Sequence, residues 1–541
     1  MLMKVPLLKL SMCMKIASLY PLIRGYAEAD WDFIRALLCS SRKINNFHVF
    51  LPLDCQPPKS FPNISGVSIH SVIELAEFFQ ENSIDVWHDF GYSDVSHLTH
   101  LRGLSGQIFP ITIQAQPWLL ALDLLKISKG LTEYDALLCS KPSICRIVHQ
   151  SAQSFPSSNF IPEIFTIPSG VNTSTEIISD KQDARYLLDL PGQDLIILCL
   201  TDFSVYEGGD LFPLFHAFQV VAEKHGDVRL IISGFDEYGY ADKFQNFLDN
   251  SHLGRQIILM PNASKSAQSL LLSAADIFIS PSDTIHRDNQ IQVLRAMGNN
   301  LPVIVTDDDD GGVIAHGKNG LKLRRICQPS SYDALNNYMP LVSEDVKPLI
   351  LSQGIVVDTQ QIIEFLTLLI EDRELRQTLG KTARHYVVAN HGWETMVNRY
   401  ISLWQTLRER VPSDLQHTKS SEIQGDILFR DANTRDFSFF SFMSADLEED
   451  TSLQLTSVGK TLLETQHLIS YDVMKDIIYP PVVFKILNLA RAVTTGAEII
   501  NSLLLLTDGD DTDNLVPNIT YHIMWCVKQG FISLSKNGQS L

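Results

Sequence analysis

The stretch from Ser280 to Gly312 holds the residues whose types and spacing point most directly to chemistry. Arg287 and Arg295 stand eight positions apart, and Asp307 to Asp310 form a run of four carboxylates. A guanidinium fork suits a phosphate group, and carboxylate-rich loops bind Mg²⁺ together with substrate phosphates. Two plainer interpretations stay open. The aspartates are also typical of a solvated acidic turn, and Arg295 is also typical of a surface residue paired with a nearby aspartate.

A second polar group follows the apolar segment "IDVWHDF". His88, Asp89 and Asp94 come just past a predicted strand end, where cleft residues of α/β proteins gather. His88 is therefore a candidate general base. A structural imidazole, satisfied by hydrogen bonds inside the fold, is the alternative.

The remaining composition limits the class of function. A net charge of −19 argues against a nucleic-acid partner, because phosphate backbones attract clustered Lys and Arg. The eight cysteines are scattered and give no zinc or disulfide framework, which suits a reducing cytoplasm. No Walker loop and no Ser/His/Asp ordering is present. Pro6 and Lys9 interrupt the apolar start, so we expect no signal peptide.

The apolar segment from Phe484 to Leu506 is the longest, and it contains Lys485, Arg491 and Glu498. Charged residues at this frequency indicate a buried or amphipathic helix rather than a membrane span. We therefore predict a cytoplasmic protein without a transmembrane segment.

Short apolar runs alternate with helix-period segments along the first three quarters of the chain. "KIASLY", "FHVFLPL", "IDVWHDF", "FPITIQA" and "YDALLCS" are predicted strands, and a second series begins with "DLIILCL". Strands that alternate with helices indicate βαβ units and parallel sheets. We predict an α/β protein with two tandem Rossmann-like, doubly wound domains and a ligand cleft between them, at the carboxyl ends of the strands.

The predicted domains are residues 14–172, residues 173–410, a polar linker at 411–426, and a mostly helical accessory domain at 427–541. The last of these ends in a helix, a glycine and a strand. Such an ending occurs in winged-helix modules and in many other small helical domains, and the acidic surroundings do not favour DNA. Residues 326–355 are predicted to be an insertion.

A series of ordered motifs resembles the GT-B glycosyltransferases, in particular the retaining enzymes of family 4. The motifs are "IPSGVN", "LCLTDFSVYEGGDLFPLFHAF", "LIISGFDEYGYADKF", "LLLSAADIFISPSD", "LRAMGNNLPVIVTD" and "HGKNGLKL", between Ile161 and Leu323. The first domain resembles the family more loosely, and the resemblance does not extend past Arg410. It implies an acceptor-side first domain and a nucleotide-sugar-side second domain.

The resemblance also implies which positions form the donor site. Family members neutralise the donor diphosphate with an arginine and then a lysine, and the matching positions here are Asp202 and, depending on register, Glu207 or Gly208. Two family glutamates, eight positions apart, contact the sugar and the ribose hydroxyls. Arg287 and Arg295 occupy those positions, and a guanidinium cannot accept hydrogen bonds from hydroxyls.

Further departures complete the set of candidates. Asn289 follows the first of these positions where the family has phenylalanine, and Gln116 stands where relatives have a histidine near the sugar. The candidate donor-cleft residues are Asp202, Glu207, Gly208, Arg287, Asn289, Arg295, Asp307 and Asp308. The candidate acceptor-side residues are Arg24, Gly25 and Tyr26 of the loop after the first strand, together with His88 and Gln116.

The implied activity is transfer of a hexose, with retention, from a nucleotide-diphosphate sugar to a glycan, lipid or protein acceptor. In that mechanism the donor phosphate helps to deprotonate the acceptor, so no protein base and no cofactor is required, and Mg²⁺ is an optional companion of the diphosphate. No resident metal site is assigned. The alternative is a catalytically silent GT-B protein that partners an active transferase through residues 427–541. A third class is binding of a non-nucleotide sugar or a phosphorylated glycan in the same cleft.

Overall fold

The fold is known from a computed structural model, which divides the chain into two compact units. One unit comprises residues 1–171 and 389–430, and the other comprises residues 172–388 and 431–541. The structure describes residues 14–19, 33–38, 44–51, 66–71, 74–90, 101–102, 105, 108–115, 131–153, 162–173, 180–204, 209–251, 253–283, 290–307, 312–328, 334–335, 339–343, 346–412, 451–470, 474, 477–505, 512–536 and 539–540.

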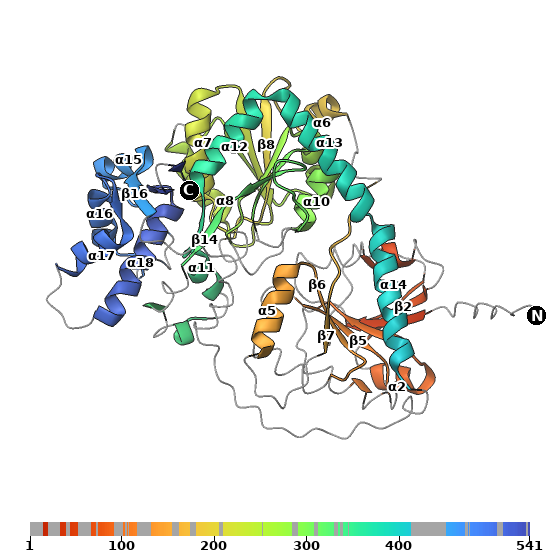
Figure 1. Ribbon diagram of the computed structural model, residues 1–541. Coiled ribbons are helices and arrows are strands. Elements are labelled where there is room, and N and C mark those ends of the chain that lie inside the picture. The colour runs from red at the N-terminus through yellow and green to blue at the C-terminus, as the bar shows by residue number, and fades with distance from the viewer. Residues whose placement is uncertain are drawn as a thin grey trace, which may run out of the picture. The chain divides into compact units, whose positions relative to one another are not determined.

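The first unit is built on a seven-stranded sheet whose strands are all parallel (Figure 1). In spatial order the strands are β3 (Val67–Ser71), β2 (Ile44–Leu51), β1 (Met14–Leu19), β4 (Val86–Asp89), β5 (Ile111–Ala115), β6 (Ala136–Cys139) and β7 (Glu163–Thr166). Helices α2 (Leu75–Glu81) and α5 (Pro142–Gln153) connect successive strands of this sheet.

A helix from much later in the chain completes the core of this unit. The buried face of α14 (Trp393–Arg410) joins one hydrophobic cluster with β1, β2, β4 and β6. Trp404 is fully buried, and its Nε1 donates a hydrogen bond to Thr112 Oγ1 on β5 at 3.1 Å. The predicted second domain, 173–410, therefore differs from the observed unit. The reason is that the apolar stripe of α14 packs on the first sheet.

The second unit contains a six-stranded parallel sheet. Its strands, in spatial order, are β10 (Ile257–Pro261), β9 (Val228–Gly234), β8 (Leu195–Leu200), β11 (Ile277–Ser280), β12 (Val303–Thr306) and β13 (Leu321–Leu323). Its helices are α6 (Lys181–Leu187), α7 (Phe212–Lys224), α8 (Tyr240–Asp249), α9 (Lys265–Ala274), α10 (Gln290–Gly298), α12 (Thr359–Glu371) and α13 (Arg373–Asn390), the last of which ends in the first unit. The prediction of two doubly wound Rossmann-like sheets is confirmed.

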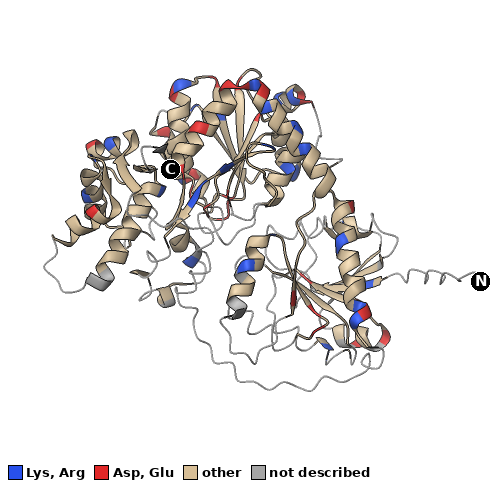
Figure 2. Ribbon diagram, viewed as in Figure 1, with Lys and Arg blue, Asp and Glu red and all other residues tan. Residues whose placement is uncertain are grey.

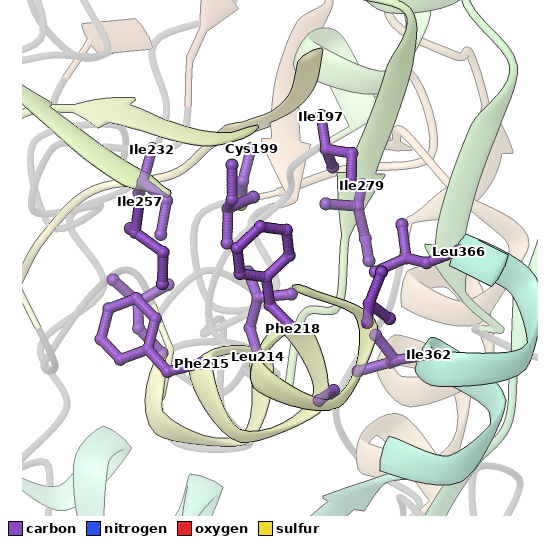
Figure 3. Packing of buried hydrophobic residues seen from close by; sticks show 14 of the residues in the cluster. Ile197, Cys199, Leu214, Phe215, Phe218, Ile232, Ile257, Ile279, Ile362 and Leu366 are labelled. Carbon is purple, nitrogen blue, oxygen red and sulfur yellow. The ribbon is translucent and has the colours of Figure 1, made fainter. Parts of the chain in front are cut away.

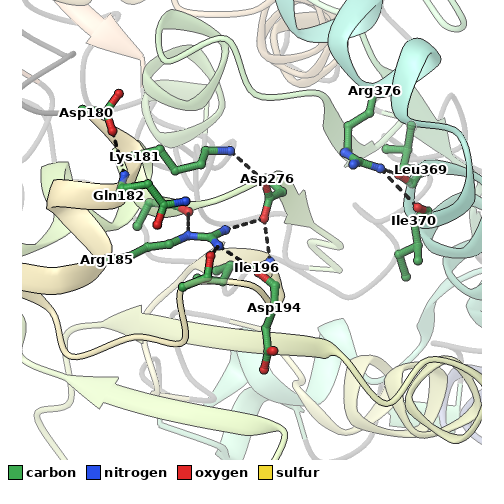
Figure 4. Close-up of polar contacts among 12 residues, drawn as sticks. Asp180, Lys181, Gln182, Arg185, Asp194, Ile196, Asp276, Leu369, Ile370 and Arg376 are labelled. Carbon is green, nitrogen blue, oxygen red and sulfur yellow. Dashed lines mark hydrogen bonds and ion pairs between the residues drawn. The ribbon is translucent and has the colours of Figure 1, made fainter.

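The core of the second sheet explains why these segments fold as they do. β8 is an uninterrupted apolar run because both of its faces are covered, as is usual in a parallel sheet. Phe215 and Phe218 of α7 and Ile362 and Leu366 of α12 pack beneath it (Figure 3). At the amino ends of the strands, buried Arg185 of α6 bonds to Asp276, at 2.6 Å, and to three backbone carbonyls (Figure 4).

The predicted insertion and the C-terminal region both belong to the second unit. The insertion begins within β14 (Arg325–Cys327), contains the 3₁₀ helix η4 (Met339–Leu341) and α11 (Lys347–Ser352), and ends at the first residue of β15 (Ile355–Val357), which pairs antiparallel with β14. The C-terminal region contains β16 (Thr451–Leu455), α15 (Ser457–Thr465), α16 (Pro480–Leu489), β17 (Thr494–Thr495), α17 (Gly496–Leu504), α18 (Thr512–Lys528), β18 (Ile532–Lys536) and β19 (Gln539–Ser540).

This C-terminal region is helical, as predicted, and it also has a four-stranded sheet in the order β17-β16-β18-β19. Among the described helices, none is long and apolar enough to cross a membrane. Basic and acidic residues are interspersed over the described helices (Figure 2). The predicted linker lies outside the described residues beyond residue 412.

The contact of α14 with the first sheet yields a stability prediction. Trp404→Ala removes a fully buried side chain and should lower the free energy of unfolding of the first unit by about 3–5 kcal/mol. Chemical denaturation monitored by hydrogen exchange of β5 measures it. Asn398→Ala, at an exposed position of the same helix, serves as the control and should cost less than about 1 kcal/mol. Equal effects of the two substitutions would contradict the packing of α14.

Candidate functional site

The second sheet has its topological switch point between β8 and β11. From β8 the chain proceeds outward through β9 and β10, and it then returns to the other side of β8 to form β11. Doubly wound sheets bind ligands at this point, beyond the carboxyl ends of the strands. The loops after β8 and β11 are therefore the candidate site, and residues 201–204, 209–211 and 281–283 of them are described.

The two loops contact each other directly. The Asp283 carboxylate, which follows β11, accepts a hydrogen bond from the backbone N–H of Asp210 at 3.3 Å to one oxygen and 3.4 Å to the other. Gly209 has φ +91°, and a Cβ at this position would lie 2.6 Å from Asp283 Oδ1. Only glycine fits such a conformation and such an approach. Asp210 Oδ1 also accepts from Phe212 N at 2.9 Å, at the beginning of α7.

The cation that contacts these loops comes from the C-terminal region. Lys528, the last residue of α18, forms an ion pair with Asp283, and the side chains are 1% and 4% exposed. Its Nζ also donates to Ser352 O at 2.9 Å and to Ile355 O at 3.3 Å. Burial lowers the pKa of the Lys528 ammonium to about 8, while the nearby Asp210 carboxylate acts to raise it.

The residue after Lys528 extends this contact. Gln529 Nε2 donates to Asp210 Oδ2 at 2.7 Å, and Gln529 O lies 2.7 Å from His216 Nδ1 on α7. Sequence reasoning missed Asp283, Lys528 and Gln529. The only signals were an aspartate directly after "ISPS" and a lysine at the end of the apolar run "IMWCV".

Asp202, which stands where the resemblance implies an arginine, holds two loops together. Its Oδ1 accepts a hydrogen bond from the backbone N–H of Phe235 at 3.0 Å, in the loop after β9. The Asp202 carboxylate therefore lies at the carboxyl ends of strands β8 and β9. Four further donor-site candidates, Glu207, Gly208, Arg287 and Asn289, lie outside the described residues.

Arg295 binds to a neighbouring helix. Its guanidinium contacts Ser269 Oγ at 3.1 Å and Gln268 Oε1 at 3.4 Å on α9, and Gln292 Oε1 at 3.2 Å on its own helix. These contacts fasten α10 to α9. A role for Arg295 toward a phosphate stays a prediction.

The first aspartate of the acidic run is engaged in an ion pair. Asp307 Oδ1 lies 2.8 Å from Lys322 Nζ on β13. Asp308 lies outside the described residues, as do Asp309 and Asp310. Within the described part of the chain, no group of three or more His, Cys, Asp or Glu side chains is placed to hold a metal ion.

In the first unit, the prediction for His88 as a cleft residue is wrong. The side chain is 1% exposed, and its Nδ1 lies 3.0 Å from Thr112 Oγ1. The rings of Phe33, Phe90, Tyr400 and Trp404 surround it. The strand β4 continues to Asp89, so His88 lies within the strand and under α14 rather than beyond the strand end. The other acceptor-side candidates, Arg24, Gly25, Tyr26 and Gln116, lie outside the described residues.

A hollow of about 240 Å³ lies along the junction of the C-terminal region with α7 and α12. Its walls are mainly aliphatic, and the Asp358 carboxyl is among its polar groups. Burial raises the pKa of Asp358 to about 6, and its Oδ1 accepts from Gln360 N and Gln361 N at the start of α12. Asp358, one of several polar residues of this hollow, thus caps α12 through one of its carboxylate oxygens.

Comparison with known proteins identifies the type of domain and fold. Residues 195–339 match the family model described as Glycosyl transferases group 1. The structure is similar to the sucrose-phosphate synthase of Thermosynechococcus elongatus, with 15% identity and a TM-score of 0.51 over 74% of this chain and 100% of that one. It is also similar to Anabaena HepE in complex with UDP-glucose, with 12% identity and a TM-score of 0.53 over 73% and 100%.

A glycosyltransferase of Rickettsia africae gives a comparable match, with 11% identity and a TM-score of 0.52 over 74% and 100%. The search of curated proteins found no match. The structural matches show the GT-B fold, and the family match supports glycosyl transfer as the general type of activity.

The burial of His88 predicts an acid sensitivity of the first unit. Burial lowers its pKa from 6.5 to about 4, so between these values the unfolded chain binds a proton that the folded chain does not. The free energy of unfolding is therefore unaffected by His88 above pH 6.5. As the pH falls from 6.5 toward 4, protonation of His88 in the unfolded chain lowers it by roughly 3 kcal/mol. His88→Asn should lack this part of the loss. The measurement is the free energy of unfolding at several pH values.

An unchanged pH dependence in His88→Asn would show that the imidazole is accessible in the folded protein.

Proposed function

We propose that this protein is a glycosyltransferase of the GT-B type, resembling family 4, that transfers a hexose from a nucleotide-diphosphate sugar. The acceptor is a hydroxyl of a glycan, a lipid or a protein, and the transfer proceeds with retention. The observation that carries the proposal is the family match over residues 195–339, which begins at β8 and spans both loops of the switch point. The complex of Anabaena HepE with UDP-glucose supports a nucleotide sugar as the donor.

The donor carries about two negative charges, and the protein must compensate them as the diphosphate leaves. At the described edge, Asp202 adds a further negative charge, and the Asp283 carboxylate is already paired with Lys528. The positive charge must therefore come from other groups. We propose that Arg287 and a Mg²⁺ ion that accompanies the donor, held by Asp307 and Asp308, supply it. A donor phosphate oxygen then accepts the acceptor's proton, so the reaction needs no protein base and no cofactor apart from this ion.

A catalytically silent GT-B protein is the second candidate, and a specific observation favours it. The described polar residues at the family's donor positions are engaged in contacts within the fold, Asp202 with Phe235 and Arg295 with α9. Such a protein would bind an active transferase through its C-terminal region.

For both candidate functions we place the protein in the cytoplasm, since the described cysteines are all free thiols.

Calorimetric titration of the full chain with UDP-, GDP- and ADP-sugars, with and without Mg²⁺, distinguishes the two candidates. The proposed function predicts micromolar binding of one donor class, strengthened by Mg²⁺. Binding of none of them, together with co-purification of an active transferase, would replace it with the silent-partner function.

The charge of Asp202 provides a sharper prediction. Asp202→Asn keeps an oxygen that accepts from Phe235 N and removes one negative charge, so the affinity for a nucleoside diphosphate should rise about fivefold, an effect of about 1 kcal/mol. The Kd for UDP measured at low ionic strength tests it. Asp249→Asn, on the exposed end of α8, should leave the Kd unchanged. An equal rise in affinity in both variants would mean that only the net charge of the protein matters and that Asp202 is remote from the donor.

A further inference from the structure

The end of α18 connects the C-terminal region to two other parts of the second unit. Tyr521 Oη donates to Ile350 O at 2.9 Å, and Trp525 Nε1 donates to Gln353 Oε1 at 3.2 Å, so this helix face binds the insertion. One turn further on, Lys528 and Gln529 reach the switch-point loops. Figure 1 shows α18 beside α11. The contacts therefore continue from the insertion to the candidate site.

Burial along this face is close to complete. Tyr521, Trp525 and Lys528 are each 1% exposed, and Gln353 is 0% exposed. Tyr521 and Trp525 bond to residues of the insertion, so this face of α18 is covered by the protein's own chain. The face therefore serves an intramolecular contact.

The position of the ion pair gives this contact a consequence for the site. Asp283 bonds to the backbone of the loop after β8 and belongs to the loop after β11, so a single carboxylate joins the two loops. Lys528 holds that carboxylate, and Gln529 holds the Asp210 side chain of the other loop. If α18 were displaced, Asp283 would lose its buried cation, and desolvation would favour rotation of the carboxylate toward water. The loops would then lose their mutual contact.

We propose that Lys528 is a positioning residue of the donor site. By pairing with Asp283, it fixes the relative position of the Gly209–Asp210 turn and the Pro281–Asp283 segment, and so makes the C-terminal region a structural part of the donor-binding half. The role of Lys528 in donor binding rests on the proposed function. Its role in fixing the two loops is independent of the proposed function.

Hydrogen exchange of the full chain tests the fixing of the loops. In Lys528→Met, peptides that contain Asp210 and Asp283 should exchange at least tenfold faster, because the Asp210 N–H loses the oriented carboxylate that accepts its hydrogen bond. Peptides from β9 and from the first sheet should exchange as in the wild type. Lys460→Met, at an exposed position of α15 in the same region, is the matched control and should exchange as the wild type throughout.

Two results would overturn the inference. One is wild-type exchange at Asp210 and Asp283 in Lys528→Met. The other is an equal increase over the whole second unit, which would indicate only general destabilisation. If Lys528→Met does not fold, Gln529→Leu removes a neutral contact to Asp210 and should raise exchange at Asp210 alone, by a few-fold. No increase there would equally overturn the inference.

Calorimetry with the donor that binds the wild type tests the role for the site. At a temperature at which both variants are fully folded by circular dichroism, Lys528→Met should bind this donor at least tenfold more weakly, and Lys460→Met should bind it like the wild type. Equal affinity in Lys528→Met would overturn the positioning role for the donor. If the wild type binds no nucleotide sugar, the proposed function is wrong and so is this role, whereas the exchange rates still decide whether Lys528 fixes the loops.

Discussion

The buried ion pair between Lys528 and Asp283 is the interaction on which the organisation of the second unit depends. It joins residues 245 positions apart and lies where the C-terminal region, the insertion and the switch-point loops meet. Removing two charges from water costs several kcal/mol per ion, and only good geometry and further hydrogen bonds offset this cost. Here two backbone carbonyls and the Asp210 amide supply those bonds. The C-terminal region and the second sheet consequently belong to one compact unit.

Charged residues have different roles at the two ends of the strands of the second sheet. At the amino ends, Arg185 forms a structural network by donating to Asp276 and to three backbone carbonyls. At the carboxyl ends of the strands, Asp202, Asp210 and Asp283 belong to the loops at which we propose that the diphosphate donor binds. An anionic ligand is repelled there unless other cations accompany it.

Much of the fold follows from the sequence because continuous apolar runs such as β8 and amphipathic segments such as α12 specify their own type of element. Pairings between distant segments do not follow in this way. The apolar stripe of α14 identifies an amphipathic helix, but both sheets offer an apolar face, and the sequence does not say which one it covers. The same helix buries His88. The position of His88 near a predicted strand end suggested a cleft residue, whereas the imidazole lies in the core. Nothing in the sequence near Lys528 or near Asp283 indicates that the two residues form an ion pair.

A double-mutant cycle on Lys528 and Asp283 tests the central claim most directly. The free energy of unfolding of the second unit would be measured for the wild type, Lys528→Met, Asp283→Asn and the double variant. Since each single variant leaves one buried polar group without its partner, the account predicts a coupling energy of about 2 kcal/mol or more between the two sites. A coupling energy near zero, with additive effects of the two substitutions, would show that the pair does not connect the C-terminal region to the switch point.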